Sequence, residues 1–192
     1  SSFSYEIIVV VDGSEDNTWS VALELSKKYK VLRSIQLLRN YGQHTANLSG
    51  FRHAEGSYII TMDDDGQNPP SELKNFEKFI GSEYDLIIGK HRSKKHGPIR
   101  RLGSKVIGYL NRKIFNIKSH ITLSNYRMIR RDVIERINVD KSPQPYIPGL
   151  CLKYSNNQKN IDIFHRERLI GKSNYNIGKL VSLVFELLIQ HS

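Results

Sequence analysis

The sequence predicts an α/β fold in which a mostly parallel sheet is covered by helices on both faces. Short runs of β-branched residues, typical of buried strands, alternate with amphipathic segments of helical length. Polar side chains gather where these strands end, and open parallel sheets bind ligands at the carboxyl ends of their strands. With 192 residues and no linker or repeat, the chain is expected to form one domain over residues 1–192.

The first half of the chain alternates strands and helices. The expected elements are a strand over 5–11, a helix over 19–29, a strand over 31–38, a helix over 44–54, a strand over 58–62 and a helix over 71–80. The first strand ends in a turn that starts at Asp12, and Gly56 ends the second helix. The pair Pro69 and Pro70 is expected to interrupt both strand and helix.

The second half is less regular. The expected elements are a strand over 85–89, a basic loop over 90–101, a helix over 102–114, a strand or bend over 124–129, helices over 132–137 and 150–154, a strand over 161–165, a loop over 171–176 and a helix over 177–190. The last helix carries its apolar residues along one face. That pattern favours core packing, and the basic loop nearby leaves open that segment 177–192 lies in a membrane interface.

An acidic stretch follows the strand over 58–62. Alternate residues at a strand end point the same way, so Asp63 and Asp65 can share one target while Asp64 faces elsewhere. Mg²⁺ and Mn²⁺ prefer oxygen ligands and bind through one or two carboxylates plus substrate phosphates. A metal-nucleotide site is one interpretation, and a solvated acidic turn is the other.

The net charge of +10 indicates an anionic partner such as nucleic acid, a membrane surface or a phosphate-bearing substrate. The single cysteine, Cys151, excludes a disulfide within the chain and a CxxC site. The sequence has no apolar run long enough to span a membrane and no signal-peptide pattern.

Several segments, in order, resemble the family-two glycosyltransferases of GT-A fold, in particular the polyprenyl-phosphate sugar transferases related to dolichol-phosphate mannose synthase. The matching segments are 7–18, 40–43 with Gly50, Ala54 and Gly56, 62–70, Gly89 with Arg92, 126–128, and 168–175. Together they cover nearly the whole chain, and they favour the metal-nucleotide interpretation of the acidic stretch.

The resemblance implies a role for each matching residue. Asp65 and Gln67 are the expected metal ligands, for Mg²⁺ or Mn²⁺, and Asp63 orients the site. The catalytic residues are then Asp63, Asp65 and Arg127. The residues expected to bind the nucleotide-sugar donor or the acceptor are Asp12, Asp63, Arg92, Arg127, Arg168, Lys172, Ser173 and Tyr175. From the residues alone, Asp12 accepts hydrogen bonds from a nucleobase or ribose, or caps the next helix. Arg92 and Arg127 suit bidentate phosphate binding, the alternative being ordinary surface arginine.

The implied reaction is a metal-dependent, inverting transfer of a sugar from a UDP- or GDP-sugar to a polyprenyl phosphate. An ionised lipid phosphate needs little general-base help, so positioning and electrostatic stabilisation would supply the catalysis. The implied place is the cytoplasmic face of a membrane with an anionic surface, in the synthesis of cell-envelope glycans.

The chain departs from the family pattern in two respects. Val11 stands where relatives carry an aspartate, which affects how the nucleobase is held. The family's first strand and helix are not in the sequence, and many bacterial relatives continue into transmembrane helices, so we expect a fragment. An exposed sheet edge would then favour pairing between chains as a homo-oligomer.

Three other functions would fit parts of the sequence. A glycosyltransferase that extends a surface glycan would share the donor site, but it needs a carboxylate base that the sequence does not identify. A nucleotidyltransferase would use a similar metal-nucleotide site. A basic nucleic-acid-binding module would explain the charge, but the sequence carries no recognisable motif for reading nucleic acid, so no nucleic-acid partner is expected.

Overall fold

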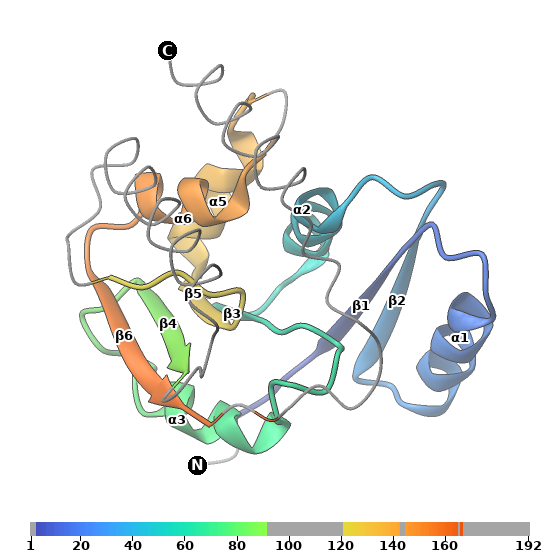
Figure 1. Cartoon of the computed structure of the whole chain (residues 1–192), viewed down its shortest axis with the longest axis horizontal. Helices are drawn as coiled ribbons and strands as arrows, with labels where there is room; N and C mark the ends of the chain where they lie inside the picture. Colours follow the sequence, from blue (N-terminus) through green and yellow to red (C-terminus); the bar gives the residue numbers. More distant parts are fainter. Residues whose placement is uncertain (1–2, 92–120, 143–144, 165, 167–192) are drawn as a thin grey trace, which may run out of the picture. The chain divides into compact units, whose positions relative to one another are not determined.

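The computed structural model describes residues 3–91, 121–142, 145–164 and 166 (Figure 1). Its strands are β1 (Ile7–Asp12), β2 (Leu32–Leu37), β3 (Tyr58–Thr61), β4 (Leu86–His91), β5 (Arg127–Arg130) and β6 (Gln158–Ile163). Its helices are α1 (Thr18–Lys28), α2 (Gln43–His53), α3 (Leu73–Glu77), α5 (Arg131–Val139) and α6 (Ile147–Tyr154), and a 3₁₀ turn, η1, covers Pro70–Glu72.

The described residues form two compact units. The first contains the chain up to Thr61 and returns over Met128–Tyr154; the second begins at Met62, runs to Arg127 and resumes at Ser155. The expectation of one domain over residues 1–192 stays a prediction.

The first unit opens with the β1–α1–β2 unit that the sequence predicts. β1 and β2 are parallel and in register from Ile7 opposite Leu32 to Asp12 opposite Leu37, so the two strands end at the same level. Ala22, the buried residue of α1, lies on the helix face that packs on β2. Further along the chain, β3 lies beside β5.

Helices α2, α5 and α6 supply most of the core of the first unit. Val133, Ile134 and Ile137 recur at helical spacing on α5 and are all buried. The buried residues of α6 include the single cysteine, Cys151, which is 1% exposed.

After α5, the Asp140 carboxylate accepts hydrogen bonds from Lys153 Nζ at 2.9 Å and Tyr154 Oη at 2.6 Å. Burial opposes ionisation of Asp140, yet these donors and Ser142 hold its pKa well below the usual range.

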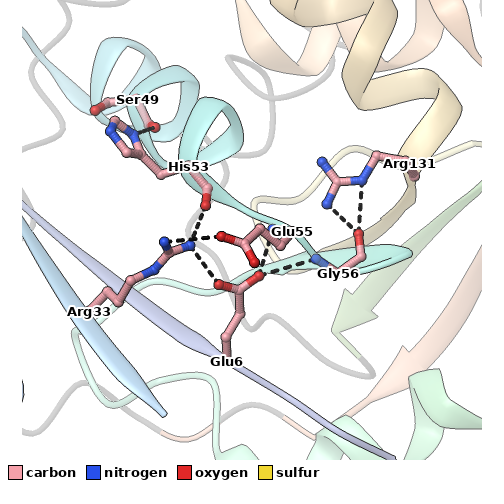
Figure 2. A network of polar contacts seen from close by, with 7 residues as sticks. All are labelled: Glu6, Arg33, Ser49, His53, Glu55, Gly56 and Arg131. Atoms are coloured by element: carbon pink, nitrogen blue, oxygen red, sulfur yellow. Dashed lines mark hydrogen bonds and ion pairs between the residues drawn. The ribbon is translucent and has the colours of Figure 1, made fainter. Parts of the chain in front are cut away.

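A polar network joins the start of β1 to β2 and to the turn between α2 and β3 (Figure 2). The Glu6 carboxylate accepts the backbone N–H groups of Glu55 at 2.6 Å and Gly56 at 3.1 Å, and pairs with Arg33 at 2.9 Å. Arg33 also donates to Glu55 Oε1 and to the His53 carbonyl, and Arg131, the first residue of α5, donates to the Gly56 carbonyl. Burial alone would raise the pKa of Glu6, but the backbone donors and Arg33 outweigh it and lower that pKa.

We expect Glu6→Gln to lower the free energy of unfolding by about 2 kcal/mol at pH 7, because the charged acceptor of two backbone N–H groups is lost. Because the folded-state pKa is lowered, this contribution is present above the unfolded-state pKa, near ~4.3, and disappears as the pH falls through the folded-state pKa. The difference between the two proteins should therefore close on acidification, which urea unfolding at several pH values measures.

Glu55→Gln is the matched control for this prediction. Glu55 pairs with the same arginine, but its side chain is 80% exposed, so its loss should cost no more than about 0.5 kcal/mol. Equal effects of the two substitutions at pH 7 would contradict the importance of the backbone hydrogen bonds.

The second unit is built on the parallel pair β4 and β6, in register from Leu86 opposite Gln158 to His91 opposite Ile163. Leu86, Ile87 and Ile88 are all buried, the continuous apolar run that parallel strands show when both faces are covered. The buried Asp85 carboxylate accepts the N–H groups of Asn156 and Asn157 and so fixes the entry into β6.

Several predicted boundaries are wrong. The helix expected over 71–80 is instead the 3₁₀ turn η1 followed by the short α3, because Pro70 begins the turn and the N–H groups of Phe79 and Ile80 bond three residues back. α6 begins before the predicted helix over 150–154, at Ile147, and Pro148 lies in its first turn. β4 extends to His91, into the predicted basic loop, and β6 begins before the predicted strand.

The rest of the basic loop, the helix expected over 102–114, the loop over 171–176 and the helix over 177–190 lie outside the described residues. Within the part of the chain that is described, no helix combines the length and the apolar character needed to cross a membrane.

Candidate functional site

The acidic stretch is a turn in the second unit, directly after β3. Asp63, Asp65 and Gln67 are half-buried while Asp64 and Gly66 are exposed, which follows the alternation that the sequence predicts. Asp65 Oδ1 accepts the backbone N–H of Gln67 at 3.1 Å, and Gly66 adopts a φ of 72°. This local closure places the side chains of Asp65 and Gln67 on neighbouring positions of one tight turn.

The donor set of this turn fits a hard divalent cation. It offers two carboxylates and an amide oxygen, the ligands that Mg²⁺ and Mn²⁺ bind together with substrate phosphates. Next to it, Asn68 is 6% exposed and its Oδ1 accepts no hydrogen bond within the described chain. A buried acceptor without a donor is costly and rare, so the end of the turn holds an unused oxygen. The described residues contain no cluster of three or more His, Cys, Asp or Glu side chains arranged for a metal.

The segment after β6 runs beside this turn. The N–H of Arg166 donates to the Gln67 carbonyl at 2.9 Å, and the N–H of Phe164 donates to the Glu72 carboxylate at 3.1 Å. An exposed cation thus begins the segment that leads to residues 168–175. The sequence interpretation assigned Arg166 no role and saw Glu72 only as an acidic residue in a first helical turn; neither spacing nor composition signals their long-range bonds.

Arg127 lies at the start of β5 and is 2% exposed. The alternative of an ordinary surface arginine is therefore wrong for this residue. Its guanidinium donates to Asn125 Oδ1 at 3.0 Å. Its neighbour Tyr126 is fully buried against Phe76, with ring centroids 4.8 Å apart; burial, with the charge of Glu72, raises the pKa of Tyr126 to about 12. Arg127 is an enclosed positive charge here, and direct binding of a phosphate by it stays a prediction.

Asp12 lies in the first unit, at the end of β1. Its two carboxylate oxygens accept the backbone N–H groups of Tyr41 at 2.8 Å and Gly42 at 2.7 Å. The alternative that Asp12 caps the next helix is wrong, because the N–H of Thr18 at the start of α1 bonds to Asp16. The preceding residue, Val11, is 4% exposed and belongs to the core.

Gly13 brings the turns that follow β1 and β2 into direct contact. A Cβ at this position would lie 2.2 Å from Arg39 C and from Asn40 N, and the φ of Gly13 is 64°. This contact and the hydrogen bonds to Asp12 hold the two turns together at the carboxyl end of the β1–β2 pair.

The other predicted site residues, Arg92, Arg168, Lys172, Ser173 and Tyr175, lie outside the described residues. Of those described, the second unit carries Asp63, Asp65, Gln67 and Arg127, and the first carries Asp12. Their individual roles stay predictions.

Residues 2–138 match the family profile described as glycosyl transferase family 2. The chain belongs to glycosyl transferase family 2. The resemblance inferred from the sequence motifs is thereby confirmed.

The chain is also similar to curated relatives. It is 32% identical over 185 residues to the undecaprenyl-phosphate 4-deoxy-4-formamido-L-arabinose transferase of Shewanella sediminis, and 31% identical over 185 residues to that of Photorhabdus laumondii. These matches cover 96% of this chain but 56% and 57% of the relatives, so the chain spans little more than half of their length.

Solved structures of similar fold are glycosyltransferases of GT-A type. Glucosyl-3-phosphoglycerate synthase from Mycobacterium tuberculosis, in complex with Mn²⁺, UDP-glucose and phosphoglyceric acid, has a TM-score of 0.61 at 15% identity, covering 95% of this chain and 66% of that one. S. aureus TarS 1–349 in complex with UDP-GlcNAc has a TM-score of 0.56 at 20% identity, covering 97% and 58%. The family-2 chain therefore has the α/β, Rossmann-like GT-A fold that the sequence predicts.

Proposed function

We propose that this family-2 domain catalyses transfer of a sugar from a UDP-sugar to a polyprenyl phosphate. The observation that carries the proposal is the turn after β3, where Asp63, Asp65 and Gln67 alternate as half-buried oxygen donors. The names of the relatives support the lipid acceptor and suggest 4-deoxy-4-formamido-L-arabinose as the sugar.

In this proposal Asp65 and Gln67 hold the divalent cation, Mn²⁺ or Mg²⁺, and Asp63 orients them. The bound cation would offset the negative charge that develops on the leaving nucleoside diphosphate. Asp65 is fixed for this role by its hydrogen bond to the Gln67 N–H, which limits the positions that its carboxylate can adopt. The Mn²⁺ present in the mycobacterial synthase supports a divalent cation in this role.

The acceptor phosphate carries its own nucleophilic oxygen, already ionised near neutral pH. The protein then has to position it and to stabilise the leaving group. Arg127 supplies positive charge from within the second unit, and Arg166 supplies it from the segment bonded to Gln67. Attack of the phosphate oxygen on the anomeric carbon, with departure of UDP from the opposite face, inverts the configuration. Such an acceptor places the enzyme at a membrane, and we propose its cytoplasmic face.

The test is an assay with UDP-linked 4-deoxy-4-formamido-L-arabinose, undecaprenyl phosphate in detergent micelles and Mn²⁺ or Mg²⁺. We expect label to move into the lipid extract, transfer to stop in excess EDTA, and the anomeric proton in NMR to show inversion. Transfer to a soluble glycan but not to the lipid would contradict the acceptor, and undiminished transfer in EDTA would contradict the metal.

A further inference from the structure

The turn after β2 presents an aromatic side chain beside Asp12. Tyr41 is 45% exposed, although its backbone N–H is held by the Asp12 carboxylate and its carbonyl accepts a hydrogen bond from Thr45 Oγ1 at 3.2 Å. The backbone of this residue is therefore fixed on both sides while much of its ring remains open to a ligand.

The neighbouring residues make the position of the turn rigid. The N–H of Gly42 donates both to Asp12 and to Asn40 Oδ1, and its carbonyl accepts from Ala46 in the first turn of α2. The backbone of Arg39 and Asn40 packs directly on Gly13. A ring on such a turn is preorganised, so a ligand that contacts it pays little for ordering the loop.

One side of the Tyr41 ring is already used. The guanidinium carbon of Arg39 lies 5.0 Å from the ring centroid, within the range of a cation–π contact. A flat, uncharged ring can stack on an aromatic face, and the adjacent cation suits a ligand that also carries phosphates. A nucleobase attached to a diphosphate has both properties. The turn lies at the carboxyl end of the parallel β1–β2 pair, the edge at which α/β sheets bind nucleotides.

We propose that Tyr41 is a nucleotide-binding residue whose ring stacks on the base of the donor, and that Asp12 acts as a positioning residue by holding the Tyr41 backbone. This inference rests on the proposed function. Val11 has no polar side chain with which to hold a base, and Tyr41 would supply part of the base-binding surface instead. Stacking accepts any base, so Tyr41 contributes affinity rather than discrimination between uracil and guanine.

Calorimetric titration with UDP and Mn²⁺ tests the proposal on the wild type and on Tyr41→Ala, Tyr41→Phe and Leu38→Ala. Tyr41→Ala should weaken UDP binding by about 5- to 150-fold, the range seen when a base loses its aromatic partner. Tyr41→Phe keeps the ring and should bind like the wild type. Leu38 lies in the same turn and is 97% exposed, so Leu38→Ala is the matched control and should change nothing.

Inorganic pyrophosphate with Mn²⁺ serves as the ligand without a base. Its affinity should be equal in wild type and Tyr41→Ala; an equal loss for both ligands would show a general disturbance of the site and overturn the stacking role. UDP binding that survives Tyr41→Ala would overturn this inference alone. Equal affinity of the wild-type chain for pyrophosphate and for UDP would also overturn it, because the base would then add nothing to binding. Binding of neither ligand would count against the proposed function itself.

Discussion

Asp65→Asn is expected to lower kcat/KM for sugar transfer on the order of 10²- to 10³-fold, the usual loss when one group that stabilises transition-state charge is removed. Asparagine retains an oxygen in the place of Oδ1, so the hydrogen bond from the Gln67 N–H can persist. The substitution therefore removes the charge of a predicted metal ligand without removing the turn. Initial rates at several Mn²⁺ concentrations measure the effect.

Asp64→Asn provides the control, because it removes one negative charge from the same stretch at an exposed position. It should change kcat/KM by no more than a few-fold. Mn²⁺ binding followed by electron paramagnetic resonance in the presence of UDP should weaken in Asp65→Asn and not in Asp64→Asn. If the two variants lose activity equally, the charge of the stretch matters and Asp65 has no special part in it.

Gly13→Ala is expected to lower the free energy of unfolding by about 3 kcal/mol or more. Its new Cβ would meet the backbone of Arg39 and Asn40 at 2.2 Å, and backbone atoms cannot turn aside as a flexible side chain can. A left-handed φ adds its own cost for any residue with a side chain. The turns after β1 and β2 must separate, which also weakens the bonds from Asp12 to Tyr41 and Gly42.

Gly81→Ala separates the steric cost of the new Cβ from the conformational cost of a left-handed φ. Gly81 has a similar φ of 77°, but a Cβ there meets nothing within 4 Å, so only the conformational cost of about 1 kcal/mol should appear. Urea unfolding of both variants measures the difference. A Gly13→Ala variant that is no less stable than Gly81→Ala would contradict the close contact between the two turns.

Local pattern was sufficient to predict much of the fold. Residues 7–11 are all β-branched, and residues 32–37 mix Leu32, Ile35 and Leu37 with polar side chains; both strands formed within two residues of the predicted bounds. The failure at residues 71–80 has a local cause as well. Hydrogen bonds three residues back occur at Glu72, Phe79 and Ile80, so only the short α3 forms between them and it ends at Glu77.

The site was predictable only where its geometry is local. The alternation of Asp63, Asp64 and Asp65 is predicted by the two-residue period of the strand before them, and it persists into the turn. By contrast, Asp12 bonds to backbone groups 29 and 30 residues away, and Glu72 to one 92 residues away, and no sequence periodicity encodes such partners. The burial of Arg127 could not be predicted from its residue type either, because arginine is mostly exposed in proteins. It is buried here because it lies in the buried run from Tyr126 to Ile129.

The buried thiol of Cys151 gives the chain a built-in reporter. A thiol at 1% exposure reacts with an alkylating reagent only when the structure around it opens, and no second cysteine competes for the label. Because α6 belongs to the same unit as the β1 and β2 turns, the labelling rate of Cys151 reports how often that unit opens. A substitution in those turns that increases transient opening should raise the alkylation rate of Cys151, under conditions in which the chain remains native.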